Sequence, residues 1–144
     1  MKIFITFAPC FISVKIRHIV YNILINSIIR GIFEKKGHEV VCIDLSRVEN
    51  AICDYFVICH GDSNTQVNAI AESVEKETVE QCSVRPLSVE GTGNAEWVLL
   101  DYGQTVVHVF QKPIRMRYQL EELWGDGKVT RIEESNNQYQ YEQS

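Results

Sequence analysis

An alternating segment near the middle of the chain, residues 94–110, constrains the fold more than any other segment. Along residues 97–102, Val98, Leu100 and Tyr102 alternate with Trp97, Leu99 and Asp101, and residues 105–110 alternate in the same way. A period of two is typical of β-strands. Gly103 lies between the two runs and can adopt the positive φ angle of a tight turn at no steric cost. The segment therefore predicts a β-hairpin with its turn at Gly103.

Both faces of this hairpin are largely apolar. An antiparallel sheet in a small domain usually buries one face and exposes the other to water. We therefore expect one face to lie in the core, and the other to be covered by a helix or by a binding partner.

Length and charge limit the kind of partner that the chain can have. At 144 residues it is long enough for one domain with a single core. Its net charge of −5 is the opposite of the basic excess with which proteins bind a phosphate backbone. A partner is therefore expected to be a protein, and no direct sequence-specific contact with nucleic acid is predicted.

The segments around the hairpin predict the rest of an α/β domain. Apolar residues recur at helical spacing in residues 22–33, and Gly37 supplies a helix stop. The predicted elements, in chain order, are a helix at 22–36, strands at 40–45 and 54–59, a helix from Ser63, a strand at 86–90, the hairpin, and a closing helix from Pro113 to Trp124. The fold class is α/β, a single domain with a mixed, roughly five-stranded sheet flanked by helices in the order α-β-β-α-β-β-β-α.

Two of the predicted helices have recognisable starts. Ser63 and Gln66 have the spacing of a capping box, and Pro113 suits the first turn of the closing helix. The buried side of the closing helix is predicted to consist of Met116, Leu120, Leu123 and Trp124.

The two ends of the chain differ from the domain, which we place at residues 20–126. Residues 1–19 form an extension of uncertain order, whose apolar run is shorter than the ~20 residues that cross a membrane. Lys15 and Arg17 follow this run where a signal peptide would have its cleavage site. Residues 127–144 are polar and lack periodicity, so we expect a disordered tail. No association with a membrane is predicted.

The cysteines are predicted to be buried free thiols. There are five of them, and no two have the C-x-x-C spacing. Cys53, Cys59 and His60 could approach a metal ion, but Cys42 lacks the spacing that a fourth zinc ligand would have. We assign no metal and no cofactor.

Four blocks of sequence, taken together and in order, carry a resemblance to a known family. The blocks are CDYFVICHGDSNTQVNAI at 53–70, RPLSVEG at 85–91, EWVLLDYGQTVVHVF at 96–110 and RYQLEELW at 117–124. This pattern resembles the ribosomal silencing factor family, also called Iojap-like, over roughly residues 22–126.

The resemblance implies a cytoplasmic bacterial protein that has no catalytic activity and binds the large ribosomal subunit. In the family, the partner is the fourteenth large-subunit protein, and binding blocks joining with the small subunit. The result is reduced translation when nutrients are short. A homodimer is a further expectation, because an apolar hairpin invites self-association.

The partner-binding residues are predicted on the hairpin, where aromatic anchors lie beside polar groups. The predicted set is Trp97, Leu99, Asp101, Tyr102, Gly103 and His108. The alternative is that Trp97 packs beneath the closing helix as part of the core.

Enzyme and nucleotide-binding functions are the alternatives in another class. The family fold resembles that of nucleotidyltransferases, which need two carboxylates at D-x-D spacing soon after a Gly-Ser turn. Here Glu72 is the first acid after Ser63, and it stands alone. A phosphate could bind the start of the second helix, but Asp62 stands where the anion would lie. Asp101 and His108 could form an acid–base pair, but no nucleophile is placed beside them.

Overall fold

A seven-stranded mixed sheet organises the computed structural model, which describes residues 14–134 and 139–143, with side chains from residue 23 to residue 134. The helices are α1 (Val14–Glu34), α2 (Asn64–Cys82), α3 (Lys112–Tyr118) and α4 (Leu120–Leu123). The strands are β1 (His38–Asp44), β2 (Tyr55–Gly61), β3 (Ser88–Glu90), β4 (Trp97–Asp101), β5 (Thr105–Gln111), β6 (Lys128–Glu134) and β7 (Tyr139–Gln143). Their order in the sheet is β3-β4-β5-β2-β1-β6-β7. The predicted α/β fold class is confirmed.

The predicted hairpin is present as β4 and β5. The two strands pair in antiparallel register, with Trp97 opposite Phe110 and Leu99 opposite His108. Gly103 lies in the turn with a φ angle of +86°, as its position predicted. On its other side β5 pairs in parallel with β2, which makes the sheet mixed and places β5 in its interior.

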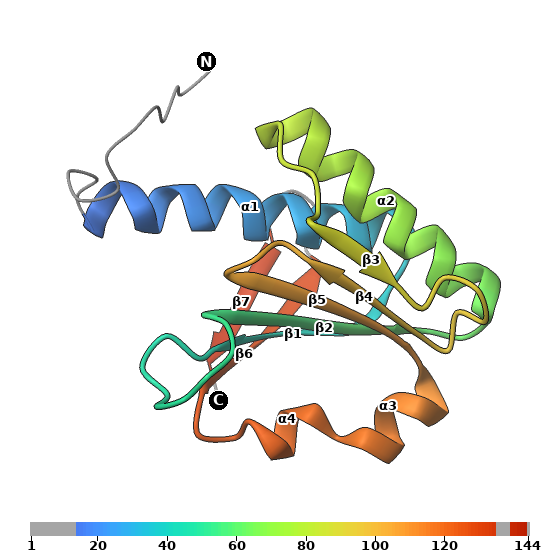
Figure 1. Cartoon of the computed structure of the whole chain (residues 1–144). Helices are drawn as coiled ribbons and strands as arrows, with labels where there is room; N and C mark the ends of the chain where they lie inside the picture. Colours follow the sequence, from blue (N-terminus) through green and yellow to red (C-terminus); the bar gives the residue numbers. More distant parts are fainter. Residues whose placement is uncertain (1–13, 135–138, 144) are drawn as a thin grey trace.

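Helices cover both faces of the sheet (Figure 1). Val98, Leu100 and Val107 pack with residues of α1 and α2 in the larger core. Phe56 and Phe110, whose side chains point to the opposite face, pack with Leu120 of α4 in a second core. The second apolar face of the hairpin is therefore covered by the chain's own helices.

The start of α2 follows the predicted capping pattern. Ser63 is the N-cap, and its Oγ accepts a hydrogen bond of 3.1 Å from the backbone N–H of Gln66. The Gln66 side chain accepts a hydrogen bond of 2.7 Å from the backbone N–H of Asp62, one residue before the cap. These bonds satisfy N–H groups at a helix start that would otherwise need water.

The first helix is longer than predicted. Helix α1 begins at Val14, so residues 14–19 continue the helix that was predicted to begin at Asn22. The remainder of the predicted extension, residues 1–13, lies outside the described residues. No helix among the described residues is long and apolar enough to cross a membrane.

The prediction of a disordered tail is wrong for residues 128–134 and 139–143. Strand β6 pairs with β1, and β7 pairs with β6, so the sheet has seven strands instead of about five. Ile132 is buried in the core that contains α1 and α2. The few apolar residues of β6 give a weak pattern, and the strand forms because β1 offers it a partner for backbone hydrogen bonds.

The predicted closing helix is two short helices. Gln119 separates them with a φ angle of +47°, which ends α3 before α4 begins. Leu120 is buried and Trp124 is half-buried, as predicted, but Met116 and Leu123 are exposed. A buried Arg115 takes the inward position on α3.

The contact between α1 and α2 allows a test of the larger core. A Cβ atom on Gly31 would lie 2.7 Å from the backbone Cα of Val74, and Ser73 Oγ donates a 2.7 Å hydrogen bond to the Gly31 carbonyl. We expect Gly31→Leu to lower the free energy of unfolding by about 1–3 kcal/mol, because the helices must separate. Urea unfolding measures this. Gly93→Leu is the matched control, since a Cβ there meets nothing within 4 Å, and equal stability losses for the two variants would contradict the prediction.

Candidate partner-binding surface

The six residues predicted to bind a partner do not share one surface. Trp97, Leu99 and Asp101 alternate with the buried residues of β4 and lie on the side of the sheet that carries α3 and α4. Tyr102 packs against the opposite core, where its hydroxyl lies 3.0 Å from Thr78 Oγ1 of α2. The predicted grouping of Tyr102 with Trp97 is therefore wrong, because neighbouring strand residues point to opposite faces.

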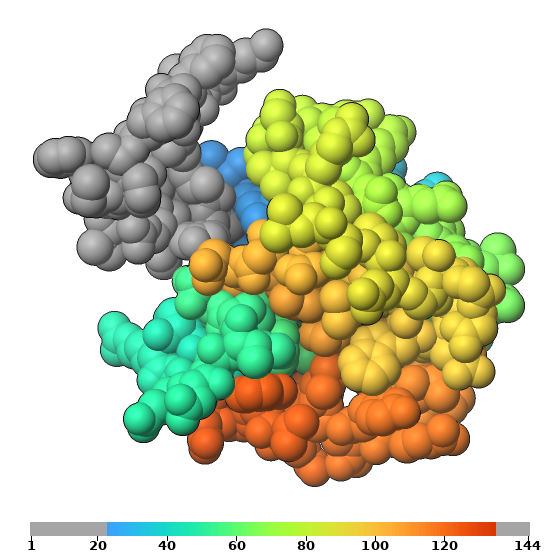
Figure 2. Space-filling view, viewed as in Figure 1, coloured from blue at the N-terminus to red at the C-terminus, as the bar shows by residue number. Residues whose placement is uncertain are grey.

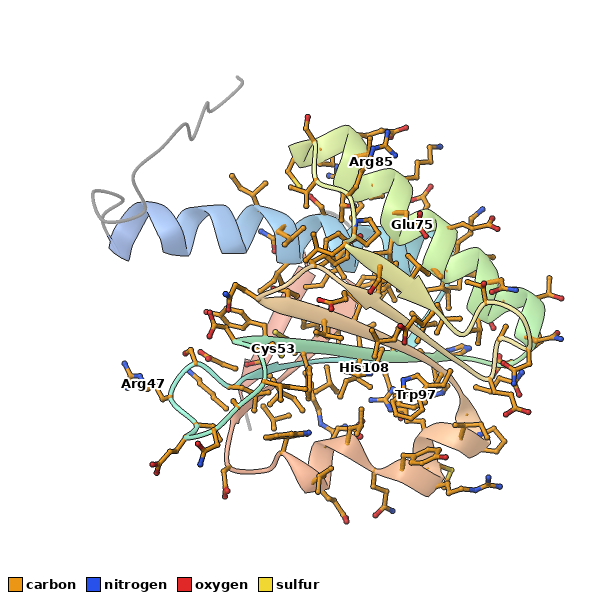
Figure 3. The ribbon with its side chains drawn as sticks, in the orientation of Figure 1. Arg47, Cys53, Glu75, Arg85, Trp97 and His108 are labelled. Carbon is orange, nitrogen blue, oxygen red and sulfur yellow. The ribbon has the colours of Figure 1, made fainter. Side chains whose placement is uncertain are left out.

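Trp97 is half-buried between the sheet and α3. Its ring centroid is 4.8 Å from that of Phe110 and 5.0 Å from that of Tyr118. Its indole N–H donates a 3.1 Å hydrogen bond to Nδ1 of His108, and Figure 3 shows the two side chains together on the α3–α4 side of the sheet. The indole therefore packs beneath a helix, as the alternative prediction had it, while part of it remains exposed.

His108 lies too deep to contact a partner directly. It is 4% exposed, and its ring meets the ring of Phe56 edge-on at a centroid distance of 4.7 Å. Burial lowers the pKa of His108 to about 4, and the charge of Glu121 opposes this shift. His108 is therefore neutral near pH 7.

Asp101 and His108 do not form the acid–base pair that was considered. Asp101 is opposite Val106 in the hairpin, and its carboxylate accepts a 2.7 Å hydrogen bond from the backbone N–H of Gly103. Nδ1 of His108 is occupied by Trp97. Gly103 therefore serves the turn, and His108 supports the tryptophan.

The start of α2 is not arranged as a phosphate site. The backbone N–H of Gln66 donates to Ser63 Oγ, and that of Thr65 donates to Asn64 Oδ1 at 2.8 Å. The Asp62 carboxylate lies 2.9 Å from Nε2 of His38, so it is held at the helix start by a partner. A fixed carboxylate repels a phosphate at this position.

Arg115 ties α3 to α4 and to the sheet. Its Nε and Nη2 atoms donate to Oε1 of Glu121 at 2.8 and 2.6 Å. Its Nη1 atom donates to the Glu39 carbonyl at 2.8 Å and lies 3.0 Å from Nδ1 of His60. Burial lowers the pKa of His60, and the Arg115 guanidinium lowers it further. The sequence analysis missed Arg115, since a charged helical residue is expected to face solvent.

Large apolar side chains remain exposed on the two short helices. Met116 is 64% exposed, Tyr118 is 51% exposed and Leu123 is 70% exposed. The half-buried Trp97 touches Tyr118, and Leu99 packs in the core that α3 and α4 cover. We call these five residues the α3–α4 surface. In Figure 2 the yellow-orange segment around β4 adjoins the orange segment of α3 and α4.

Two hollows lie on the surface of the described residues. One, of about 250 Å³, is lined by residues that include Glu39, Arg115, Glu121 and Arg131. Another, of about 370 Å³, lies beside α2, where Figure 3 labels Glu75 and Arg85. Among residues 23–134 no cluster of three or more His, Cys, Asp and Glu side chains could hold a metal ion.

The described cysteines are free thiols in poorly reactive surroundings. Burial raises the pKa of Cys42 and of Cys59 to about 12, and that of Cys53 to about 11. A thiol becomes a nucleophile or a metal ligand as the thiolate, which these pKa values disfavour. Cys10 lies outside the described residues.

The fold is that of a small α/β protein whose two short helices carry exposed large apolar side chains. A family model described as "Ribosomal silencing factor during starvation" (RsfS) matches residues 21–144, a range that includes β6 and β7. The chain therefore belongs to the ribosomal silencing factor family.

Individual relatives agree with this assignment. The chain is 40% identical over 110 residues to "Ribosomal silencing factor RsfS" of Halalkalibacterium halodurans, covering 76% of this chain and 92% of that protein. A crystal structure of a Chromobacterium violaceum protein aligns with a TM-score of 0.64 and 32% identity, covering 75% of this chain and 85% of that one. The mouse "Mitochondrial assembly of ribosomal large subunit protein 1" is 30% identical over 96 residues, which are 65% of this chain and 42% of that protein.

The anchoring role of Arg115 predicts a loss of stability on substitution. Arg115→Met leaves the Glu39 carbonyl and a partly buried Glu121 without their donor. We expect the free energy of unfolding to fall by about 2–3 kcal/mol, less than for a fully buried pair because Glu121 is partly exposed. Arg117→Met, at an exposed position of the same helix, should change it by less than about 0.5 kcal/mol. Similar unfolding midpoints in urea for the two variants would refute the anchoring role.

The neutral state of His108 predicts a dependence of stability on pH. Its pKa is lowered from 6.5 to about 4 on folding, so between these values the unfolded chain binds more protons. The contribution of neutral His108 to the free energy of unfolding is complete above about pH 6.5. Up to about 3 kcal/mol of this free energy is lost as the pH falls to about 4. Urea unfolding at a series of pH values should show a shallower slope for His108→Leu than for the wild type. The two proteins differ in no other titratable group, so parallel pH profiles would show that His108 does not contribute.

Proposed function

We propose that the protein binds the large ribosomal subunit through its fourteenth large-subunit protein and thereby prevents joining with the small subunit. The consequence is repression of translation in the cytoplasm when nutrients are limited. The family description, which names ribosome silencing during starvation, supports this proposal. The mouse relative adds support, because its name refers to assembly of the ribosomal large subunit.

The observation that carries the proposal is the α3–α4 surface. Large apolar side chains that are exposed within one short segment, here residues 116–123, are typical of protein-binding sites. Binding energy usually concentrates in a few aromatic and apolar anchors with a polar rim, and here Tyr118 and Met116 lie on the same short helix as the exposed Lys112 and Arg117. Arg115 holds this helix against the sheet, so little ordering is required when a partner binds.

Charge favours a protein over RNA as the direct partner. The chain has a net charge of −5, so the phosphates of ribosomal RNA repel it and a basic protein surface attracts it. Long-range electrostatic attraction increases the association rate more than it increases the affinity of the final complex.

Silencing by this route requires only that the protein remains bound to the large subunit, and it involves no chemical step. A 144-residue domain has a radius of gyration of about 15 Å, so one bound copy separates two surfaces that must otherwise touch. The protein then acts stoichiometrically, and its effect follows the fraction of subunits that carry it. A homodimer formed through the same surface would compete with ribosome binding, and light scattering over a dilution series would detect it.

Sedimentation with purified subunits tests the partner and the surface together. The wild type should co-sediment with large subunits and not with small subunits. Met116→Asp combined with Leu123→Asp should weaken binding roughly 30-fold, which corresponds to about 2 kcal/mol. The melting temperature should change little, because both side chains are exposed.

Ile52→Asp is the matched control, since Ile52 is an exposed apolar residue in the loop between β1 and β2. It should bind as the wild type does. Wild-type protein that stays at the top of the gradient at micromolar concentration would overturn the proposed function. A doubly substituted protein that binds normally would instead show that another surface makes the contact.

A further inference from the structure

We propose that His108 is a positioning residue, which fixes the indole of Trp97 in the orientation presented at the α3–α4 surface. This inference rests on the proposed function, because it assigns Trp97 to the surface that binds the ribosome. His108 itself is buried and acts through the tryptophan.

The hydrogen bond between the two rings restricts Trp97 in a way that stacking does not. A rotation of 180° about the Cβ–Cγ bond returns the indole to the same plane, so stacking on Phe110 and Tyr118 alone does not decide which edge of the ring points inward. The indole has a single N–H donor, and Nδ1 of His108 accepts from it at 3.1 Å. The bond therefore selects, of the two orientations related by this rotation, the one in which the N–H points to His108.

His108 is itself held in place. Its ring lies edge-on to Phe56 at 4.7 Å and parallel to Phe110 at 6.1 Å, with an interplanar angle of 13°. Since β5 is paired on both sides, by β4 and by β2, its backbone cannot shift without breaking two ladders. A rigid acceptor on an interior strand therefore sets the position of a ring that reaches the surface.

A histidine at this position is costly if its role is only to fill space. When Nδ1 accepts a hydrogen bond, the neutral ring carries its proton on Nε2. Nε2 is buried and has no hydrogen-bond partner among the described protein groups. A buried N–H without an acceptor is destabilising, and an apolar side chain of similar size would avoid the cost. The acceptor at Nδ1 gives a reason for a histidine here.

The geometry also links His108 to the exposed part of the surface. Trp97 touches Tyr118 at a centroid distance of 5.0 Å, and the rings are tilted by 43°. Tyr118 is half exposed at the end of α3, next to the break at Gln119. An indole that turns would displace this tyrosine, and the shape of the α3–α4 surface would change.

The first test follows the indole N–H of Trp97 by NMR in the full-length protein, with Trp124→Phe used to assign the two indole resonances. His108→Asn keeps an acceptor near the position of Nδ1, whereas His108→Leu removes it. We expect hydrogen exchange of the Trp97 indole N–H to be roughly fivefold faster in His108→Leu, and close to the wild-type rate in His108→Asn. Equal exchange rates in all three proteins would overturn the hydrogen bond and with it the proposal.

The second test measures binding to purified large subunits. His108→Leu should bind roughly tenfold more weakly than the wild type, and His108→Asn should restore binding to within about twofold. Trp97→Phe keeps the stacked ring but loses the donor, so it should weaken binding as His108→Leu does. The two changes together should cost no more than either alone, because they remove the same interaction.

The outcomes separate the inference from the proposed function. If the wild type does not bind large subunits, the proposed function fails, while the exchange rates still decide whether His108 orients the indole. If the wild type binds and His108→Leu binds equally well, the positioning role is wrong. If His108→Leu does not fold, Trp97→Phe decides alone, since undiminished binding by this variant would overturn the proposal.

Discussion

The parallel pairing of β5 with β2 is the interaction on which the rest of the structure depends. It places β5 in the interior of the sheet, with β4 on its other side, so residues 105–110 are all buried. A strand in this position needs cover on both faces, because each face carries large apolar side chains. Helices α1 and α2 supply one cover, and the short helices α3 and α4 supply the other (Figure 1).

Helices α3 and α4, which cover the second face of the sheet, also form the candidate binding surface. Helices of seven and four residues are too short to be stable alone, so their position comes from tertiary contacts. Leu120 contributes apolar burial, and Arg115 contributes hydrogen bonds to a β1 carbonyl and to Glu121. Once these inward positions are occupied, Met116 and Leu123 are left facing solvent. The protein therefore has a helix segment that is held firmly against the sheet and carries apolar side chains on its outer side, as the proposed binding to another protein requires.

Among the described side chains, the two buried histidines, His60 and His108, each hold a neighbouring side chain in place. His108 accepts from Trp97, and His60 faces the Arg115 guanidinium, so each ring has its acceptor nitrogen used by a neighbour. Burial lowers the pKa of both rings, which keeps them neutral near pH 7 and able to accept. His38 is exposed and pairs with Asp62 at the start of α2. These arrangements differ from an acid–base site, where a titrating group faces a cavity that admits a substrate.

The sequence by itself determined the elements whose signal lies within a few residues. The period-two runs and Gly103 specify the hairpin, and Ser63 with Gln66 specifies the start of α2, because strand alternation and helix capping are local geometry. The tertiary structure decided the rest. Strand β6 forms because the edge of β1 is free to pair with it. Arg115 is buried because the Glu39 carbonyl and the Glu121 carboxylate accept its hydrogen bonds. Tyr102 faces α2 because strand pairing fixes the orientation of β4. Each of these outcomes depends on contacts between residues far apart in the chain, and the free energy of such contacts is absent from any local pattern.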